Sequence, residues 1–523
     1  MDVSILTMLT TTLLVGSAAL VLTLAWHHLR LKSLPYPPGP PPRLIFGNAL
    51  DIPSEKPWVA FREWTKRLGS DIIHLSALGT HIVVLHKMED IVELIWRRST
   101  IYSSRPWFPV IDILGMDKIS LVMPYGEQWR KHRFFFQEGF GKRAVPLYYP
   151  AISDKVQLFL HILLTDPARF QDHCKWFGAA VNMSVMFGHS VVVGETKDHY
   201  VSLAERLFAV ATELMHPMST LINAIPPLRH IPPWFPGATT QKRAAEINNT
   251  LKTHINEPFE SAKNSLSTGM PKECVTTRLV QHRLENGGLK IEDEDDIKTA
   301  MATAYIAACG PDTIKSALSV FFMAMALNPL VQKRAQTEID SVVGTGRLPT
   351  FDDRPSLPFI DAVMRETLRW RLVAPLAVAH ATTEDDVYKG FFIPKGTIIF
   401  PNGWAVSRDE STYANPEAFD PNRFFNPDGT LNDDKIEYAF GYGRRICPGR
   451  FLATNTLWMA IVSVLSTFNI SKARDENGVE IDIDTEAFSS VSLSLPPSFQ
   501  CSILPRSRQA EAHIQSAVAK ARD

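Results

Sequence analysis

Residues 440–449 read Phe-Gly-Tyr-Gly-Arg-Arg-Ile-Cys-Pro-Gly, and this stretch is the most informative motif in the sequence. Cys447 follows two arginines and has glycines on both sides. Glycines let the backbone pass close to a large planar ligand, and arginines with backbone N–H groups favour a thiolate over a thiol. Pro448 introduces an apolar helix whose N-terminus also favours an anion. A thiolate held in this way is a good axial ligand for haem iron, although a buried structural cysteine in a turn also fits these ten residues alone.

Length, composition and charge exclude several classes of protein. The chain has 523 residues, of which 45% are hydrophobic and 21% are charged, so it is not a disordered, collagen-like or coiled-coil chain. The net charge is −1, so the chain lacks the overall basic excess that is typical of proteins that bind nucleic acid. The five cysteines are scattered, which argues against a secreted disulfide framework and indicates reduced thiols.

The N-terminus carries a candidate membrane anchor, residues 1–32. Val3 to Trp26 contain no charge and would span about 36 Å as a helix, enough for a hydrocarbon core of about 30 Å. Basic residues follow the run and only Asp2 precedes it, which places the rest of the chain on the cytosolic side. A cleaved signal peptide is disfavoured, because the run is too long and its positive flank is on the wrong side.

The rest of the chain divides into three parts. Residues 33–42 are rich in proline and predict a stiff, extended hinge. Residues 43–506 contain no linker or repeat and predict one catalytic domain, mainly α with small β-sheets. The polar tail, residues 507–523, is expected to fray. Strands are predicted at 72–76 and 80–85, and one helix of about 50 Å at 294–327, ended by Asn328 and Pro329.

The chain resembles the cytochrome P-450 family, the haem-thiolate monooxygenases, from the anchor to about residue 505. The family signature Phe-x-x-Gly-x-Arg-x-Cys-x-Gly is met at Phe440, Gly443, Arg445, Cys447 and Gly449. Three further family motifs occur in order, at Trp129–Arg133, Glu366–Arg369 and Phe419–Phe424. The resemblance implies the cytochrome P-450 fold, with Cys447 as the axial ligand of haem b.

The resemblance also assigns residues around the haem. Trp129, Arg133 and Arg445 are expected to contact the propionates, and so is His380, although a lone histidine is more often structural. Glu366 and Arg369 share a helix face, and the family implies their burial with Arg423 behind the haem. Taken alone, that pair reads as a solvated surface ion pair worth less than about 1 kcal/mol.

Ala308–Thr313 resembles the family's oxygen-activating element, Ala-Gly-x-Asp/Glu-Thr. The resemblance makes Thr313 the residue that orients oxygen and water, and Asp312 the residue that helps to deliver protons. A bond from the Thr313 hydroxyl back to the carbonyl of Cys309 is an alternative that does not exclude this role. Pro311 lacks an N–H and should kink the helix.

The segments that the resemblance places around the substrate are largely apolar. They are 101–116, 208–221, 304–313, 373–378 and 489–493. A terpenoid, a fatty acid or another lipophilic molecule suits such a pocket, and Asp112 keeps a charged amine possible. The apolar, proline-rich stretch 225–236 is expected to dip into the bilayer, unless it is an ordinary surface loop.

No flavin or NADPH domain fits in the sequence, so electrons are expected from NADPH through cytochrome P-450 reductase, with cytochrome b5 as a second candidate donor. Basic residues for docking are Arg130, Lys131, Lys142, Arg143 and Arg444. The pattern is similar to fungal microsomal members. It predicts a protein of the endoplasmic reticulum membrane that uses O2 to hydroxylate a terpenoid in a natural-product pathway. Fatty acids, aromatics and xenobiotics are alternative substrates; a haem-thiolate isomerase or dehydratase, or a non-catalytic haem protein, are alternative functions.

Overall fold

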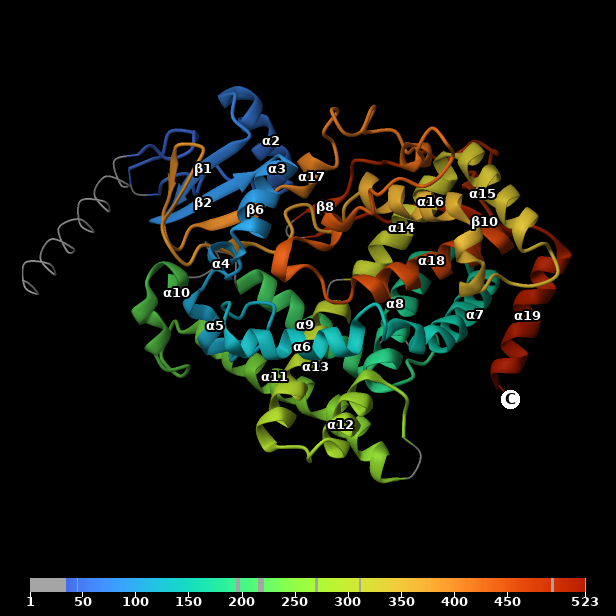
Figure 1. Cartoon of the computed structure of the whole chain (residues 1–523), viewed down its shortest axis with the longest axis horizontal. Helices are drawn as coiled ribbons and strands as arrows, with labels where there is room; N and C mark the ends of the chain where they lie inside the picture. The colour runs from blue at the N-terminus through green and yellow to red at the C-terminus, as the bar shows by residue number, and fades with distance from the viewer. Residues whose placement is uncertain are drawn as a thin grey trace, which may run out of the picture.

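The computed structural model describes residues 34–44, 46–193, 198–214, 221–268, 271–309, 312–490 and 493–522. Helices form most of the molecule, and a small twisted sheet lies at the end where the described chain begins (Figure 1). This is the predicted mainly α architecture with small sheets. The predicted anchor, residues 3–26, lies outside the described residues.

The largest sheet has four strands and joins parts of the chain that are far apart in sequence. Strands β1 (Ile72–Ala77) and β2 (Thr80–Leu85) form the predicted hairpin. Its turn residues, Leu78 and Gly79, have φ of 48° and 81°, as a tight two-residue hairpin turn requires. Strand β6 (Ile398–Pro401) pairs in parallel with β2, and β3 (His380–Ala381) pairs with β6. The pairing brings His380 to the interior edge of this sheet, where it is buried.

The proline-rich hinge forms no helix or strand over its described residues 34–42, and it lies along the sheet. The carbonyl of Pro38 accepts a hydrogen bond of 2.9 Å from the backbone N–H of His74 in β1. The ring of Tyr36 stacks on the His74 imidazole, with 4.7 Å between centroids. The described part of the hinge is therefore packed on the domain, and it fixes where the preceding chain leaves it.

Helices of all lengths enclose the rest of the core. The longer ones are α2 (Pro57–Leu68), α6 (Glu127–Phe140), α7 (Tyr149–Thr165), α8 (Phe170–Phe187), α9 (His199–Leu214), α11 (Thr239–Ser267), α12 (Val275–Glu285), α15 (Pro329–Val342), α16 (Pro358–Trp370) and α18 (Arg450–Thr467). Short α-helices are α3 (Met88–Ile91), α4 (Ser99–Tyr102), α5 (Pro109–Leu114), α10 (Leu221–Ala224) and α17 (Gly403–Val406). A π-helical stretch, η1 (Val92–Arg97), follows α3, and 3₁₀ turns include η4 (Pro226–His230), η6 (Pro421–Phe424), η7 (Glu437–Phe440) and η8 (Gly443–Arg445). Two-stranded sheets pair β4 (Asp386–Tyr388) with β5 (Phe391–Ile393), β7 (Phe468–Lys472) with β10 (Cys501–Pro505), and β8 (Ser489–Ser490) with β9 (Ser494–Leu495).

The prediction of one long helix over 294–327 is wrong, because two helices occupy that stretch. Helix α13 covers Ile291–Cys309 and α14 covers Thr313–Leu327. Asp312, just before α14, has a left-handed backbone with φ of 52°. A proline at position 311 removes the N–H that would bond the carbonyl of Ala307, which accounts for an interruption here, although residues 310 and 311 themselves lie outside the described residues.

The predicted charge network behind the site is buried, which rules out the surface ion pair. Glu366 and Arg369 are both fully buried and bond each other twice, at 2.7 and 2.8 Å. Arg423 reaches the same carboxylate at 3.1 Å from η6, and Asp420 donates its backbone N–H to it at 2.8 Å. Because an unpaired charge in this position would cost several kcal/mol, the network fixes α16 against the 414–424 segment.

The polar tail, which was expected to fray, is helical over its described residues. Helix α19 (Arg508–Arg522) packs against α7 and α18. Ala510 and Ile514 lie four residues apart on one helix face, and Ile514 is fully buried. Two apolar side chains in the right register were enough to anchor a segment whose composition is otherwise polar.

Within the described ranges, no single helix combines the length and the hydropathy that crossing a membrane needs. Residues 291–327 and the helix Pro329–Val342 are long and apolar enough for a membrane span only when they are taken together, and they are bent by 104° relative to each other.

Buried neutral histidines predict that the protein loses stability in mild acid. Burial lowers the pKa of His86 and of His254 to about 4, and lowers that of His380 well below its usual value. Between about pH 6.5 and pH 5 the unfolded chain therefore binds more protons than the folded chain. The free energy of unfolding should fall as pH falls through this window, by up to about 1.4 kcal/mol per pH unit for each such histidine.

Chemical unfolding at a series of pH values measures this slope. The double variant His86→Gln, His254→Gln should have a shallower slope than the parent, because two of the groups are gone. An equal slope in both proteins would show that these histidines are not the groups that resist protonation.

Candidate functional site

Cys447 lies in a tight turn between η8 and α18. Its backbone N–H donates to the carbonyl of Phe440 at 2.8 Å, which closes the loop. Gly443 has φ of 57°, and a Cβ there would lie 2.5 Å from the carbonyl oxygen of Ile95. Glycine is therefore required at 443 for both conformation and space. The loop holds the Cys447 side chain half-buried at the start of α18.

The surroundings of the thiol are suited to a metal-bound thiolate. Burial raises the pKa of Cys447, whereas a hydrogen bond from the Gly449 N–H and the charges of Arg133 and Arg450 lower it. A coordinated metal deprotonates a thiol outright, and the donor and the two cations then stabilise the resulting charge.

Two arginines lie beside this loop, Arg445 buried and Arg133 half-buried. Arg445 donates only to backbone carbonyls, those of Ser103, Ser120 and Met123, at 2.8 to 3.0 Å. Its guanidinium also lies 4.5 Å from the ring centroid of Trp129. Arg133 donates to the carbonyl of Ile446 at 2.7 Å. Among the described residues, no Asp or Glu forms an ion pair with either arginine.

A third arginine, Arg105, belongs to this group and was missed by the sequence analysis. It is buried, and it donates to the carbonyls of Leu121, Val378 and Ala379 at 2.8 to 3.1 Å. It lies in the substrate-facing segment 101–116, where Asp112 was singled out as the notable charge. A cation in a mostly apolar segment was the signal that could have found it.

His380 completes the group as a neutral imidazole. Its Nδ1 lies 2.7 Å from the carbonyl of Tyr102, and the side chain is buried. Burial lowers its pKa well below the usual value, and the nearby Arg105 and Arg445 lower it further. The structure therefore brings together Trp129, Arg133, His380, Arg445 and Cys447, which the sequence had placed at one site.

Uncompensated cations next to a thiol fit a haem group. Burial lowers the pKa of Arg445 to about 8 and that of Arg105 to about 9, which reflects the cost of burying charges without counter-ions. A haem carries two propionate carboxylates and needs one axial ligand to its iron. Three guanidinium groups and one thiol supply both requirements.

Asp312 and Thr313 lie together where α14 begins. The Asp312 carboxylate is 3.9 Å from Lys175 Nζ and 3.8 Å from Lys315 Nζ. Lys175 on α8 also pairs with Glu205 on α9 at 2.8 Å. Burial raises the pKa of Asp312, and the two lysines oppose that shift. Within the described part of the chain, the Thr313 hydroxyl makes no bond to the Cys309 carbonyl, so that alternative is absent here and the catalytic roles of both residues stay predictions.

Apolar residues from four helices meet beside α13, and we call them the α5–α9 cluster. Its members include Val110, Ile111 and Leu114 of α5, Leu207, Val210 and Ala211 of α9, Ala244 and Ile247 of α11, and Ile306 of α13. These helices contain much of the predicted substrate-facing sequence. Asp112 is not a free carboxylate, because it pairs with Arg229 of η4 at 2.9 Å. The cluster therefore offers no unpaired charge from Asp112 to a bound amine.

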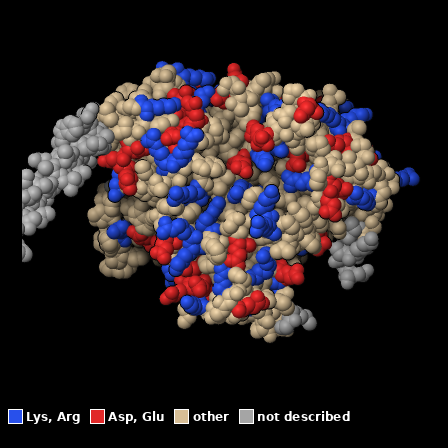
Figure 2. Space-filling view, in the orientation of Figure 1, with Lys and Arg blue, Asp and Glu red and all other residues tan. Residues whose placement is uncertain are grey.

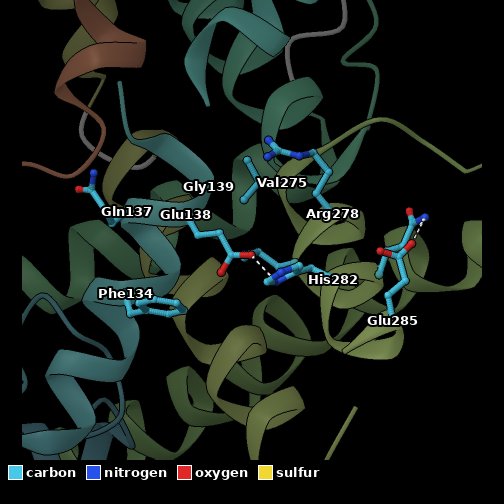
Figure 3. A pocket seen from close by; sticks show the side chains of 10 residues that line it. Phe134, Gln137, Glu138, Gly139, Val275, Arg278, His282 and Glu285 are labelled. Carbon is cyan, nitrogen blue, oxygen red and sulfur yellow. Dashed lines mark hydrogen bonds and ion pairs between the residues drawn. The ribbon is translucent and has the colours of Figure 1, made fainter. Parts of the chain in front are cut away.

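A separate groove of about 590 Å³ opens on the surface between α6 and α12. Figure 3 shows Glu138 of α6 directed at His282 of α12 across it, and Phe134 and Val275 add apolar lining. None of the predicted site residues lines this groove.

The fold and the cysteine site define a haem-thiolate protein. The family model described as cytochrome P450 matches residues 37–500, and the chain belongs to the cytochrome P-450 family. Its relatives include cytochrome P450 monooxygenase COX2 of Coprinopsis cinerea, 39% identical over 91% of this chain and 90% of the relative. Monooxygenase ple1 of Rhodocybe pseudopiperita is 39% identical over 94% and 92%, and claR of Ampulloclitocybe clavipes is 36% identical over 93% and 89%. The chain is thus a P-450 monooxygenase, an oxidoreductase.

Replacing Cys447 by serine should abolish the absorption band that the reduced, carbon-monoxide-bound form owes to thiolate ligation, because an alcohol is a poor substitute for that ligand. Cys501→Ser is the matched control, since Cys501 is also half-buried but lies outside the loop. Spectra of both purified variants test the assignment. A Cys447→Ser protein that kept the band would place the ligand elsewhere.

Proposed function

We propose that this monooxygenase inserts one oxygen atom of O2 into a lipophilic small molecule, and that the molecule is a terpenoid hydroxylated in a fungal natural-product pathway. The observation that carries the proposal is the α5–α9 cluster, which is apolar and lies beside the helix that leads to Thr313. An apolar wall binds hydrocarbon by excluding water and offers little to a polar substrate. The resemblance to fungal monooxygenases supports the pathway class.

Two sets of residues would act with the cofactor, one that holds it and one that handles oxygen and protons. Bound haem b with a thiolate ligand supplies the activation of O2. Cys447 would provide that thiolate, while Arg105, Arg133 and Arg445 would hold the propionates together with Trp129 and His380. Thr313 presents a hydroxyl at the first turn of α14, where it can orient oxygen and water. Asp312 has a raised pKa, so it can hold and release a proton closer to neutral pH than an ordinary aspartate.

Electrons come from NADPH through cytochrome P-450 reductase, and cytochrome b5 is a second candidate donor. Docking uses the exposed side chains of Arg130, Lys142, Arg143 and Arg444 near α6 and the cysteine loop. Figure 2 shows basic side chains across the middle of this face, interspersed with acidic ones. Lys131 is less available, because it lies 3.6 Å from the carboxylate of Asp296.

The protein is anchored in the endoplasmic reticulum membrane with its catalytic domain in the cytosol. Exposed apolar side chains support contact with a lipid surface: Trp234 is 80% exposed and Phe235 is 50% exposed after η4, and Leu50 is 60% exposed near the sheet. Helix α10 and the β1–β2 hairpin lie at the same end of the molecule (Figure 1). Alkaline extraction of microsomes tests the anchor, and recovery of the protein in the supernatant would contradict it.

Expression in yeast with a reductase, followed by feeding of sesquiterpenes, fatty acids and aromatics in parallel, tests the substrate class. We expect a terpenoid product heavier by one oxygen atom and dependent on NADPH. Oxidation of a fatty acid or an aromatic alone would replace the terpenoid assignment. Product formed without NADPH or O2 would instead indicate an isomerase or dehydratase.

Thr313→Ala should uncouple NADPH consumption from product formation. The hydroxyl is lost, but the cation cluster and the cysteine loop are untouched, so reduction continues and more of the oxygen leaves as hydrogen peroxide. Product per NADPH should fall several-fold, while Thr313→Ser, which keeps a hydroxyl, should stay close to the parent. Undiminished coupling in the alanine variant would show that another group organises the protons.

Arg130→Glu should slow the first electron transfer from reductase by roughly tenfold at low salt, because it reverses one charge of the docking surface. The difference should shrink as salt rises. Lys333→Glu on α15 is the control, since it reverses an exposed charge on another helix. Stopped-flow reduction measures the rate, and equal rates in the two variants would count against docking through α6.

A further inference from the structure

The two buried arginines of the site share acceptor carbonyls in one short loop segment, in addition to the bonds of Arg105 to Val378 and Ala379 and of Arg445 to Ser103. Arg445 donates to the carbonyls of Ser120 at 3.0 Å and Met123 at 2.8 Å. Arg105 donates to the carbonyl of Leu121 at 3.1 Å. We call Ser120–Met123 the carbonyl segment. Its residues belong to no helix or strand, and within the segment the backbone N–H groups of Val122 and Met123 both donate to one carbonyl, that of Ile119, at 3.0 Å.

Side chains of α6 and α13 fix the carbonyl segment through Ser120. The Ser120 hydroxyl lies 2.5 Å from Nδ1 of His132, and the Ser120 N–H donates to the Thr303 hydroxyl at 3.1 Å. Nε2 of His132 lies 3.2 Å from the Thr299 hydroxyl. His132 is fully buried, one turn from Trp129 and next to Arg133.

Both ring nitrogens of His132 have hydrogen-bond partners: the Ser120 hydroxyl at Nδ1, and at Nε2 the Thr299 hydroxyl and the Gln128 amide nitrogen, the latter 3.4 Å away. Because the Thr299 hydroxyl donates to the carbonyl of Asp295 at 2.9 Å, it can accept from Nε2–H of His132. Nδ1 is then unprotonated and accepts from the Ser120 hydroxyl. The imidazole is neutral in this arrangement, in agreement with the lowering of its pKa to about 4 by burial.

We propose that His132 is a positioning residue for the cofactor: by holding Ser120 it fixes the carbonyls that orient Arg445 and Arg105 toward the haem propionates. The inference rests on haem as the bound group in the proposed function. Since no carboxylate in the described ranges pairs with Arg445 or Arg105, their orientation depends on the carbonyls to which they donate. Loss of His132 should therefore loosen the propionates without touching the thiolate ligand.

The central variant is His132→Leu, which removes both hydrogen bonds and keeps an apolar side chain. His132→Asn is the conservative variant, because its amide oxygen can still accept from Ser120. The matched control is His254→Leu. His254 is equally buried and also bonds α13, through the carbonyl of Ala302, but it has no contact with the carbonyl segment.

Haem loss to a scavenging apoglobin and the midpoint potential of the iron are the readouts, and neither requires substrate or reductase. We expect His132→Leu to lose haem about tenfold faster, the lower end of the effect of removing residues that orient ligands. Its potential should become more negative, because poorly oriented guanidiniums leave more propionate charge uncompensated. His132→Asn should recover much of both, and His254→Leu should reduce stability alone.

Equal haem loss and equal potential in His132→Leu and His254→Leu would overturn the inference. If His132→Leu does not fold, Ser120→Ala removes a single hydroxyl and should shift both readouts in the same direction by a smaller factor; no shift would likewise overturn it. A parent protein that takes up no haem would overturn the proposed function as well. Haem uptake without terpenoid turnover would leave the role of His132 standing.

Discussion

Buried positive charge without a protein counter-ion is the constraint on which the site depends. Arg105, Arg133 and Arg445 converge on one region and end on backbone carbonyls. A guanidinium stays charged in a protein, so burying Arg105 and Arg445 and half-burying Arg133 is costly until anions arrive. The positive charge of these arginines is therefore left without a counter-charge, and a ligand with two carboxylates would supply one. The thiol of Cys447 lies near one of these cations, Arg133, and one cofactor that brings both carboxylates and a metal would satisfy the arginines and the thiol together.

The network around Glu366 uses the opposite solution to the same problem. There the chain supplies its own counter-ion, and Arg369 and Arg423 share one carboxylate in a fully buried position. The first arrangement reserves charge for a ligand, while the second one ties α16 to the segment that leads to the cysteine loop. Both hold the loop in place, because a buried charge tolerates little displacement of its partners.

The sequence predicted those features that depend on residues close together in the chain. The cysteine loop, the β1–β2 hairpin and the Glu366–Arg369 pair each carry their signal within ten residues or so. Prediction from the sequence failed for residues whose positions depend on contacts between segments far apart in the chain. Arg105 lies far in sequence from the arginine that it joins, and only the pairing of β3 with β6 brings His380 beside them. The last helix was missed because two buried side chains, not composition, decide whether it packs.

Lys175 forms ion pairs with both Glu205 and Asp312, and these pairs affect how the specificity of this enzyme can change. Helix α9 carries Glu205 on one side and Leu207, Val210 and Ala211 of the α5–α9 cluster on the other. A substitution that shifts α9 to admit a larger hydrocarbon also moves the carboxylate that holds Lys175 near Asp312. A change in the shape of the pocket is therefore coupled to a change in the protonation of Asp312. An evolved or engineered variant that widens the pocket by moving α9 also changes the distance between Lys175 and Asp312. Restoring that distance requires compensating substitutions on α8 or α14.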